Sequence, residues 1–174
     1  MERGFTVWFT GLPNAGKTTL SRLLYKNLSS RGLRVELLDG NELRQQLSPG
    51  LGHTHSERVM HHRRVAYFCR LLNRHGVICL AALIAPYQEL RQQIREEIEN
   101  YLEVFLDCPQ EILVARDQKG LYQRALAGEI ANFSGISDPY DRPANPDLHL
   151  RTDKLSEGEC LTRILSLLKA WNHV

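Results

Sequence analysis

The stretch "TVWFTGLPNAGKTT", residues 6–19, joins an apolar run to a glycine-containing loop. The loop meets the pattern G-x-x-x-x-G-K-[ST] with Gly11, Gly16, Lys17 and Thr18. Between a strand and a helix, such a loop turns backbone N–H groups around a phosphate, and the helix dipole adds positive potential. The sequence therefore predicts a phosphate-binding loop (P-loop) made of Gly11, Leu12, Pro13, Asn14, Ala15, Gly16, Lys17, Thr18 and Thr19.

The residue types in this loop predict specific roles. Lys17 is expected to reach the β- and γ-phosphates of a nucleotide, and the Thr18 hydroxyl to bind Mg²⁺. Glycine is expected at positions 11 and 16, because a side chain there would obstruct the approach of the backbone to the phosphate. The simpler alternative is a glycine-containing turn that holds a lysine by chance. The order of strand, loop and helix favours the P-loop instead.

Composition limits the classes of protein to consider. The chain has 174 residues, 43% of them hydrophobic, and a formal net charge of +2. These values predict a single domain over residues 1–174 and give no reason to expect nucleic acid or a membrane surface as a partner. The first residues show no secretory pattern, so a cytoplasmic protein is expected. Four cysteines without C-x-x-C spacing predict reduced thiols.

Short apolar runs alternate with longer segments of helical period. Strands are predicted at 6–9, 34–38, 77–84, 103–107 and 147–150, and helices at 16–30, 56–76, 87–101 and 156–172. This alternation predicts an α/β fold whose parallel sheet carries helices on both faces. Residues 128–147 have many turn-forming residues and little period, which predicts a long functional loop.

Ligands of such sheets bind at the carboxyl ends of the strands. The segments at those ends are "TGLPNAGKTT", "LDGNELR", "IAPY" and "DCP". Together they supply a phosphate loop, an acidic turn with an arginine and a corner fixed by proline. This set predicts a phosphoryl-transfer site. A Rossmann dinucleotide site is not expected, because G-x-G-x-x-G is absent.

The motifs also occur in a family-specific order. "GLPNAGKTT", "LDGNELR", "GLGHTHSERVMHHRR", "LIAPY", "ARDQKGLY" and "GEIANFSGISDPYDRPANPD" follow one another as in adenylylsulfate kinases (APS kinases), which the chain resembles over nearly its whole length. The resemblance implies a P-loop kinase with a five-stranded parallel sheet, a mobile lid at about 116–147 and a homodimer. It also implies transfer of the ATP γ-phosphoryl group, with Mg²⁺, to the 3′-hydroxyl of adenosine 5′-phosphosulfate. The product would be PAPS, in sulfate assimilation.

The resemblance also implies roles for individual residues. Catalytic positions are Lys17, Asp39 and Asn41, with Asp39 holding Mg²⁺ through water, and Arg116 lies near the adenine of ATP. Phe133 is expected as an exposed loop aromatic that stacks on the acceptor's adenine. The full set of positions expected to bind the acceptor is Arg44, Arg58, His61, Ile84, Ala85, Lys119 and Phe133.

Four positions depart from the family pattern. The usual D-G-D turn reads "DGN" here, so Asn41 replaces an aspartate often assigned as the base. An amide cannot accept the hydroxyl proton, although a loose transition state needs little base and Asp39 remains. His53 replaces an adenine-stacking phenylalanine, His61 an acceptor-contacting asparagine, and Ala85 a serine.

These departures leave two alternatives open. One is a kinase of this fold that acts on another nucleotide-linked acceptor, such as a cytidine diphosphate derivative. The other is a nucleotide-binding pseudokinase, against which the intact Lys17 and Thr18 argue.

A cluster of histidines stands in residues 53–62. A zinc site is not expected from this cluster, because the histidines lack the regular ligand spacing of zinc sites and the cysteine or carboxylate ligands that usually accompany it. His53 and His61 are instead predicted as altered acceptor contacts, and His55 and His62 as surface residues.

Overall fold

A buried strand, β1 (Thr6–Thr10), forms the centre of the computed structural model, which describes residues 4–171. The other strands are β2 (Val35–Asp39), β3 (Ile78–Ala82), β4 (Tyr101–Asp107) and β5 (Leu148–Arg151). The helices are α1 (Lys17–Ser30), α2 (Gly40–Leu47), α3 (His55–Arg74), α4 (Gln88–Glu97), α5 (Gln110–Ala115), α6 (Leu121–Leu126) and α7 (Glu157–Ala170).

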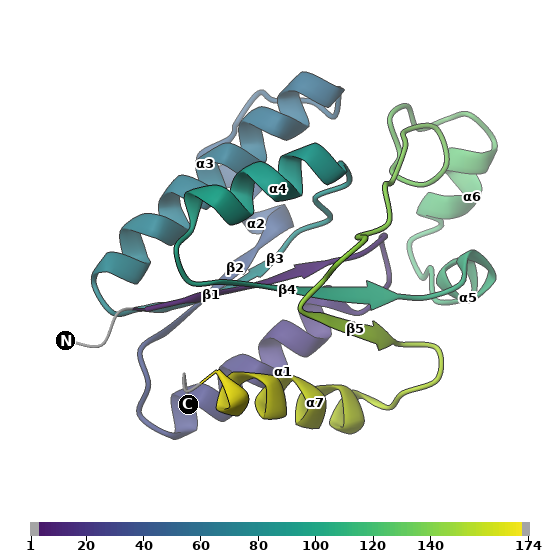
Figure 1. Cartoon of the computed structure of the whole chain (residues 1–174). Helices are drawn as coiled ribbons and strands as arrows, with labels where there is room; N and C mark the ends of the chain where they lie inside the picture. The colour runs from purple at the N-terminus through teal and green to yellow at the C-terminus, as the bar shows by residue number, and fades with distance from the viewer. Residues whose placement is uncertain (1–3, 172–174) are drawn as a thin grey trace.

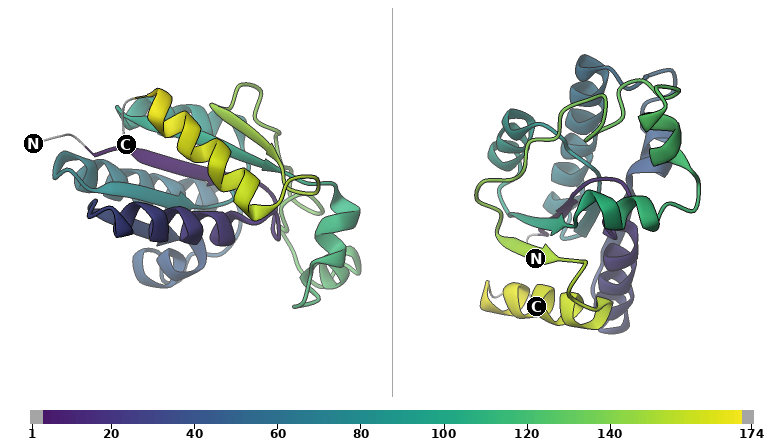
Figure 2. Two further views of the ribbon diagram at one scale, coloured as in Figure 1. Left: turned by 90° about the horizontal axis from the view of Figure 1, so that it is seen from below. Right: turned by 90° about the vertical axis from the view of Figure 1, so that its right-hand side faces the viewer.

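The five strands form one parallel sheet in the order β2-β3-β1-β4-β5. Helices α1 and α7 cover one face, and α3 and α4 cover the other, with α2 beside α3 (Figure 1). Figure 2 shows α1 and α7 side by side on their face of the sheet. The predicted five-stranded parallel sheet with helices on both faces is confirmed.

Alternation along β1 creates two cores. Val7 and Phe9 face α1 and α7, whereas Trp8 packs with α3 and α4. Side chains of a strand point alternately to opposite faces, so a strand covered on both sides must be apolar throughout. All five β1 residues are buried, as expected of an apolar run covered on both sides.

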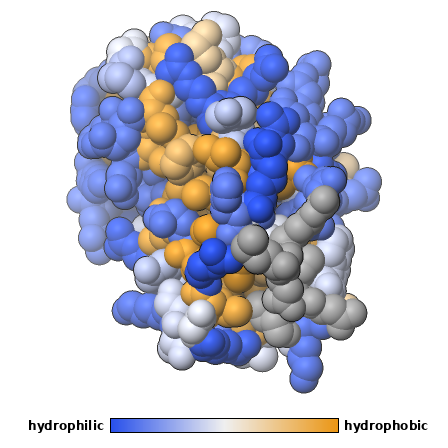
Figure 3. Space-filling model, turned by 90° about the vertical axis from the view of Figure 1, so that its left-hand side faces the viewer, coloured by the Kyte–Doolittle hydropathy of each residue, from blue (hydrophilic) through white to orange (hydrophobic). Residues whose placement is uncertain are grey.

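The carboxyl ends of the strands meet at the edge where α5 and α6 lie (Figure 1). At that edge the P-loop follows β1, α2 follows β2, and residues 83–87 follow β3. Figure 3 views the opposite edge, where apolar side chains gather in the middle of the face between hydrophilic margins. None of the helices within residues 4–171 has the length and apolar character to span a membrane.

Two predictions about helices need correction. The helix predicted at 87–101 ends at Glu97, because Ile98 has an extended backbone and Tyr101 must already pair with Thr6 in the sheet. The short helices α2, α5 and α6 were not predicted, since six to eight residues show little period. The last residue of the helix predicted at 156–172 lies outside the described residues.

Residues 128–147 contain no named helix or strand, as predicted. A turn at 133–138 is closed by backbone bonds, including those from the N–H groups of Ile136 and Asp138 to the Phe133 carbonyl at 3.0 Å. This loop returns from α6 to β5 past α4. Mobility of a lid over about 116–147 stays a prediction.

Candidate active site

The P-loop has the backbone that its glycines predict. Gly11, Asn14 and Gly16 have φ values of 150°, 64° and 100°. A Cβ on Gly11 would lie 2.6 Å from the Leu106 carbonyl oxygen at the end of β4, whereas one on Gly16 would meet open space. Contact with β4 therefore favours glycine at position 11, and the positive φ favours it at position 16.

Lys17 holds its ammonium group against the loop. Its Nζ donates to the carbonyl oxygens of Gly11 and Leu12 at 2.9 and 2.7 Å. Burial lowers the pKa of Lys17 to about 7, while the carboxylate of Asp39 opposes the shift. A nearby anion favours the charged form of a lysine. The amine is thus placed where a bound phosphate would restore its charge.

Thr18 and Asp39 join the P-loop to the end of β2. The Thr18 hydroxyl donates to Asp39 Oδ2 at 2.8 Å, and the backbone N–H of Asn41 donates to Asp39 Oδ1 at 3.0 Å. The second bond caps α2, which explains why this helix begins directly after the strand. A hydroxyl and a carboxylate are the hard oxygen ligands that suit Mg²⁺ beside a nucleotide phosphate.

A cleft of about 600 Å³ opens beside these residues. It brings together most of the predicted positions: Pro13, Asn14, Gly16, Lys17, Thr18, Thr19, Asp39, Asn41, Arg44, Arg58, His61, Ile84, Arg116, Lys119 and Phe133. His53 also lines the cleft, and the side chain of Asn41 is exposed in it. Gly11, Leu12, Ala15 and Ala85 are not among its lining residues.

The cleft wall formed by α2 and α3 is positively charged. Arg44 donates to the Gly52 carbonyl at 2.7 Å. Burial, and next the Arg58 guanidinium, lower the pKa of Arg44. Burial and then both guanidinium groups also lower the pKa of His53. Like charges held this close destabilise one another, so an anionic ligand would relieve the repulsion.

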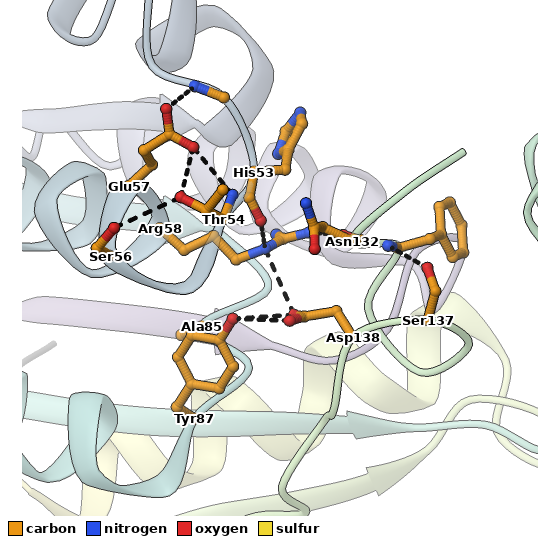
Figure 4. Close-up of polar contacts among 12 residues, drawn as sticks. His53, Thr54, Ser56, Glu57, Arg58, Ala85, Tyr87, Asn132, Ser137 and Asp138 are labelled. Carbon is orange, nitrogen blue, oxygen red and sulfur yellow. Dashed lines mark hydrogen bonds and ion pairs between the residues drawn. The ribbon is translucent and has the colours of Figure 1, made fainter. Parts of the chain in front are cut away.

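Arg58 is 6% exposed and held from several sides. Its Nε donates to the His53 carbonyl at 3.0 Å, its Nη2 donates to the Asn132 carbonyl, and its Nε lies 3.5 Å from Asp138 Oδ2 (Figure 4). Helix α3 is thereby tied to the loop that carries Phe133.

His61 and His62 are both buried, at 1% and 3% exposure. Nδ1 of His61 lies 2.9 Å from the Ser48 hydroxyl, and burial lowers the pKa of His61 to about 4. Nδ1 of His62 lies 2.7 Å from the Arg58 carbonyl, which only accepts, so Nδ1 carries the proton and Nε2 accepts from the Ala85 N–H at 3.1 Å.

The prediction of a surface position for His62 is therefore wrong. Burial lowers its pKa to about 3, so the ring bridges α3 and the loop after β3 in neutral form. His55 is exposed, as predicted, and its ring lies 4.2 Å from that of Tyr87, centroid to centroid. Within residues 4–171 there is no cluster of three or more His, Cys, Asp or Glu side chains suited to a metal ion.

Ala85 lies behind the cleft with a φ of 44° and no exposure. Its N–H donates to His62, and its carbonyl accepts from Arg91 Nη1 at 2.7 Å. The residue therefore shapes the loop that presents Ile84, and its binding of the acceptor stays a prediction.

Phe133 is 9% exposed, so it is not the exposed loop aromatic that was expected. Its ring packs edge-to-face on Tyr122, with centroids 5.0 Å apart at 73°. Tyr122 in turn donates its hydroxyl to the Pro13 carbonyl of the P-loop at 3.0 Å. Phe133 thus lines the cleft, and its contact with Tyr122 connects it to α6.

Arg116 also lines a second cavity, of about 250 Å³, between the start of α1 and the β5–α7 connection. Its Nη2 donates to the Thr152 carbonyl at 2.7 Å. This cavity lies beside the P-loop residues Asn14 and Gly16. It is suitably placed for the base of a nucleotide whose phosphates lie in the P-loop. Lys119 lines the main cleft at the start of the lid region.

Sequence reasoning missed Tyr122, His62, Tyr87 and Asp138 as structural parts of the site. Tyr122 and Asp138 stand inside "ARDQKGLY" and "GEIANFSGISDPYDRPANPD", two of the stretches that carry the resemblance. Tyr87 follows the proline corner after β3. No sequence signal identified His62, because its role depends on packing between α3 and β3.

Comparisons with known proteins identify the family. The family model of adenylylsulphate kinase matches residues 3–151. An adenylyl-sulfate kinase of Deinococcus deserti is 50% identical over 95% of this chain and 91% of its own length, and one of Chloroflexus aurantiacus is 49% identical over 95% and 89%. The solved structure of the Mycobacterium tuberculosis APS kinase CysC in complex with AMPPNP and APS has a TM-score of 0.92 and 38% identity, covering 97% of this chain and 99% of that one. The chain therefore belongs to the adenylylsulphate kinase family.

Proposed function

We propose that this chain transfers the γ-phosphoryl group of ATP to the 3′-hydroxyl of adenosine 5′-phosphosulfate, giving ADP and PAPS. Family membership supports the reaction. The observation that carries the proposal is that one continuous cleft contains both halves of such a site. It joins Lys17 and Thr18 of the P-loop to the cluster of Arg44, His53 and Arg58. The P-loop half suits a nucleoside triphosphate, and the half with the arginines suits an anionic acceptor.

In this mechanism the chain acts by positioning and by neutralising charge. The N–H groups of the P-loop and the Lys17 ammonium surround the transferred phosphate. Thr18 and Asp39 would hold Mg²⁺, which neutralises charge on the phosphate oxygens when it is bound. Arg44 and Arg58 face the acceptor's anionic groups, and Phe133 borders its base.

The same proposal includes a cytoplasmic homodimer with a mobile lid at about 116–147. Sedimentation of the purified chain measures its assembly, and hydrogen exchange with and without nucleotide measures the lid. A monomer at all concentrations would remove the dimer from the proposal without affecting the chemistry.

An ADP-release assay across a panel of acceptors tests the proposed reaction. We expect adenosine 5′-phosphosulfate to be the preferred acceptor. Preference for a cytidine diphosphate derivative would support the alternative suggested by His53 and His61. ATP binding without turnover of any acceptor would indicate a pseudokinase.

Arg58→Ala is expected to raise KM for the acceptor by roughly 10- to 100-fold, because a charge-assisted hydrogen bond contributes about 1.5–3 kcal/mol. KM for ATP should change less than threefold, since Arg58 lies on the acceptor side of the cleft. Steady-state kinetics with each substrate varied in turn measures both values. Equal losses for the two substrates would contradict the assignment.

Asn41→Asp is expected to raise kcat by up to about tenfold, a part of the 10²–10⁴ that a general base supplies. Both oxygens of Asp39 already accept hydrogen bonds from Thr18 and the Asn41 backbone, so a carboxylate at position 41 would add a free proton acceptor in the cleft. Asn41→Ala is the matched control and should leave kcat nearly unchanged. A lower kcat in Asn41→Asp would show that repulsion near the phosphates outweighs base assistance.

A further inference from the structure

Asp138 lies where three parts of the acceptor side of the cleft meet. Its side chain is 9% exposed and comes from the loop between α6 and β5. One carboxylate oxygen lies 3.5 Å from Nε of Arg58, on α3. Both oxygens accept from the Tyr87 hydroxyl, at 3.1 and 2.9 Å, from the segment after β3 (Figure 4).

The contacts of Arg58 leave one nitrogen for a ligand. Nε donates to the His53 carbonyl and Nη2 donates to the Asn132 carbonyl. Within residues 4–171, Nη1 has no hydrogen bond, and Arg58 lines the cleft. A guanidinium group with two nitrogens fixed presents the third in one direction, which lowers the entropy cost of binding an anion.

Tyr87 holds the carboxylate that faces this guanidinium. Tyr87 is 5% exposed, and its ring packs against His55 at the start of α3. Burial, and next the hydrogen bond to Asp138, raise the pKa of Tyr87 to about 12, so the hydroxyl stays a donor. The phenol therefore orients Asp138 toward Arg58 and satisfies the buried carboxylate.

The backbone of Asp138 closes the turn that carries Phe133. Its N–H donates to the Phe133 carbonyl at 3.0 Å, and its carbonyl accepts from the Gly135 N–H at 2.8 Å. The same residue thus links the aromatic that borders the cleft with the arginine that faces the acceptor's charge.

We propose that Tyr87 and Asp138 are positioning residues for the acceptor, which aim Nη1 of Arg58 into the cleft and fix the Phe133 turn beside it. This inference rests on the proposed function, because it assumes an anionic nucleotide as the acceptor. Neither residue touches the reacting atoms. Their effect is therefore expected in acceptor affinity, with ATP binding and the phosphoryl-transfer step preserved.

The test compares Tyr87→Phe and Asp138→Asn with the wild type, using adenosine 5′-phosphosulfate and ATP as the varied substrates. Tyr87→Phe removes only the hydroxyl, and Asp138→Asn keeps the backbone turn while removing the charge. Each should raise KM for the acceptor by roughly tenfold, the size of one hydrogen bond to a charged group. KM for ATP and kcat at saturating acceptor should stay within about twofold. Tyr67→Phe, on the exposed side of α3, is the matched control and should change neither KM.

A double-mutant cycle with Arg58→Ala separates positioning from general structure. If Tyr87 acts through Arg58, adding Tyr87→Phe to Arg58→Ala should raise the acceptor KM little further. Fully additive effects, or unchanged acceptor KM in both single variants of an active enzyme, would overturn the inference alone. A wild type that neither binds nor phosphorylates adenosine 5′-phosphosulfate would overturn the proposed function, and this inference with it.

Discussion

Lys17→Ala is expected to lower kcat by roughly 10²–10³, the loss typical of removing one charged or hydrogen-bonding group from a transition state. The Lys17 amine lies against the P-loop carbonyls, and Lys17 lines the cleft that would hold the γ-phosphate. Negative charge spreads over that phosphoryl group during transfer, so loss of the ammonium acts on the chemical step. Single-turnover kinetics at saturating ATP measures the change in that step.

The lowered pKa of Lys17 supplies a second readout. With a pKa of about 7 the free amine is largely neutral above pH 7, and a bound phosphate favours the protonated form. ATP binding should therefore take up a proton above pH 7, and ATP affinity should weaken as the pH rises. Calorimetry in buffers of different ionisation enthalpy measures the uptake, which Lys17→Ala should abolish. A variant that retains both proton uptake and turnover would refute the role given to this lysine.

Asp39→Asn is expected to lower kcat/KM for Mg·ATP by about 10² or more, because it removes the only charge from the Thr18–Asp39 pair. The fold should survive, since asparagine caps a helix about as well as aspartate and can still accept the Asn41 N–H. Activity measured over a Mg²⁺ titration gives both the half-saturating concentration and the limiting rate.

The form of the loss identifies what Asp39 does. A large rise in the half-saturating Mg²⁺ concentration, with the limiting rate partly recovered, is expected for a residue that holds the metal. An unchanged Mg²⁺ dependence with a lost rate would assign Asp39 the role of base, above all if Asn41→Asp is no faster than the wild type. A fully active Asp39→Asn would contradict both roles.

Much of the fold could be predicted because its signals are local. The apolar run of β1 and the glycines of the P-loop identify the central strand and the loop that follows it. The central strands are buried because helices cover both faces of the sheet. The end of α4 could not be predicted. The apolar period continues through Ile98 to Tyr101, and only the pairing of Tyr101 with Thr6 ends the helix earlier.

The position of a residue in the cleft was predicted best where that position depends on the residue's own motif. Lys17, Thr18 and Asp39 lie together as the P-loop and the acidic turn require. His62 and Phe133 differed from expectation because their environment is tertiary. His62 is buried between α3 and the loop after β3, and Phe133 is covered by Tyr122 from α6. No pattern in the sequence near either residue carries that information.

Identification of the product shows whether the chain phosphorylates the 3′-hydroxyl of adenosine 5′-phosphosulfate. The purified chain is incubated with Mg²⁺, adenosine 5′-phosphosulfate and ATP labelled in the γ-phosphate, and the labelled nucleotide is then treated with a 3′-nucleotidase. We expect a labelled bisphosphorylated product that retains its sulfate and releases its label as inorganic phosphate. Label that stays in ATP, or that appears on the acceptor at a position resistant to the 3′-nucleotidase, would contradict it.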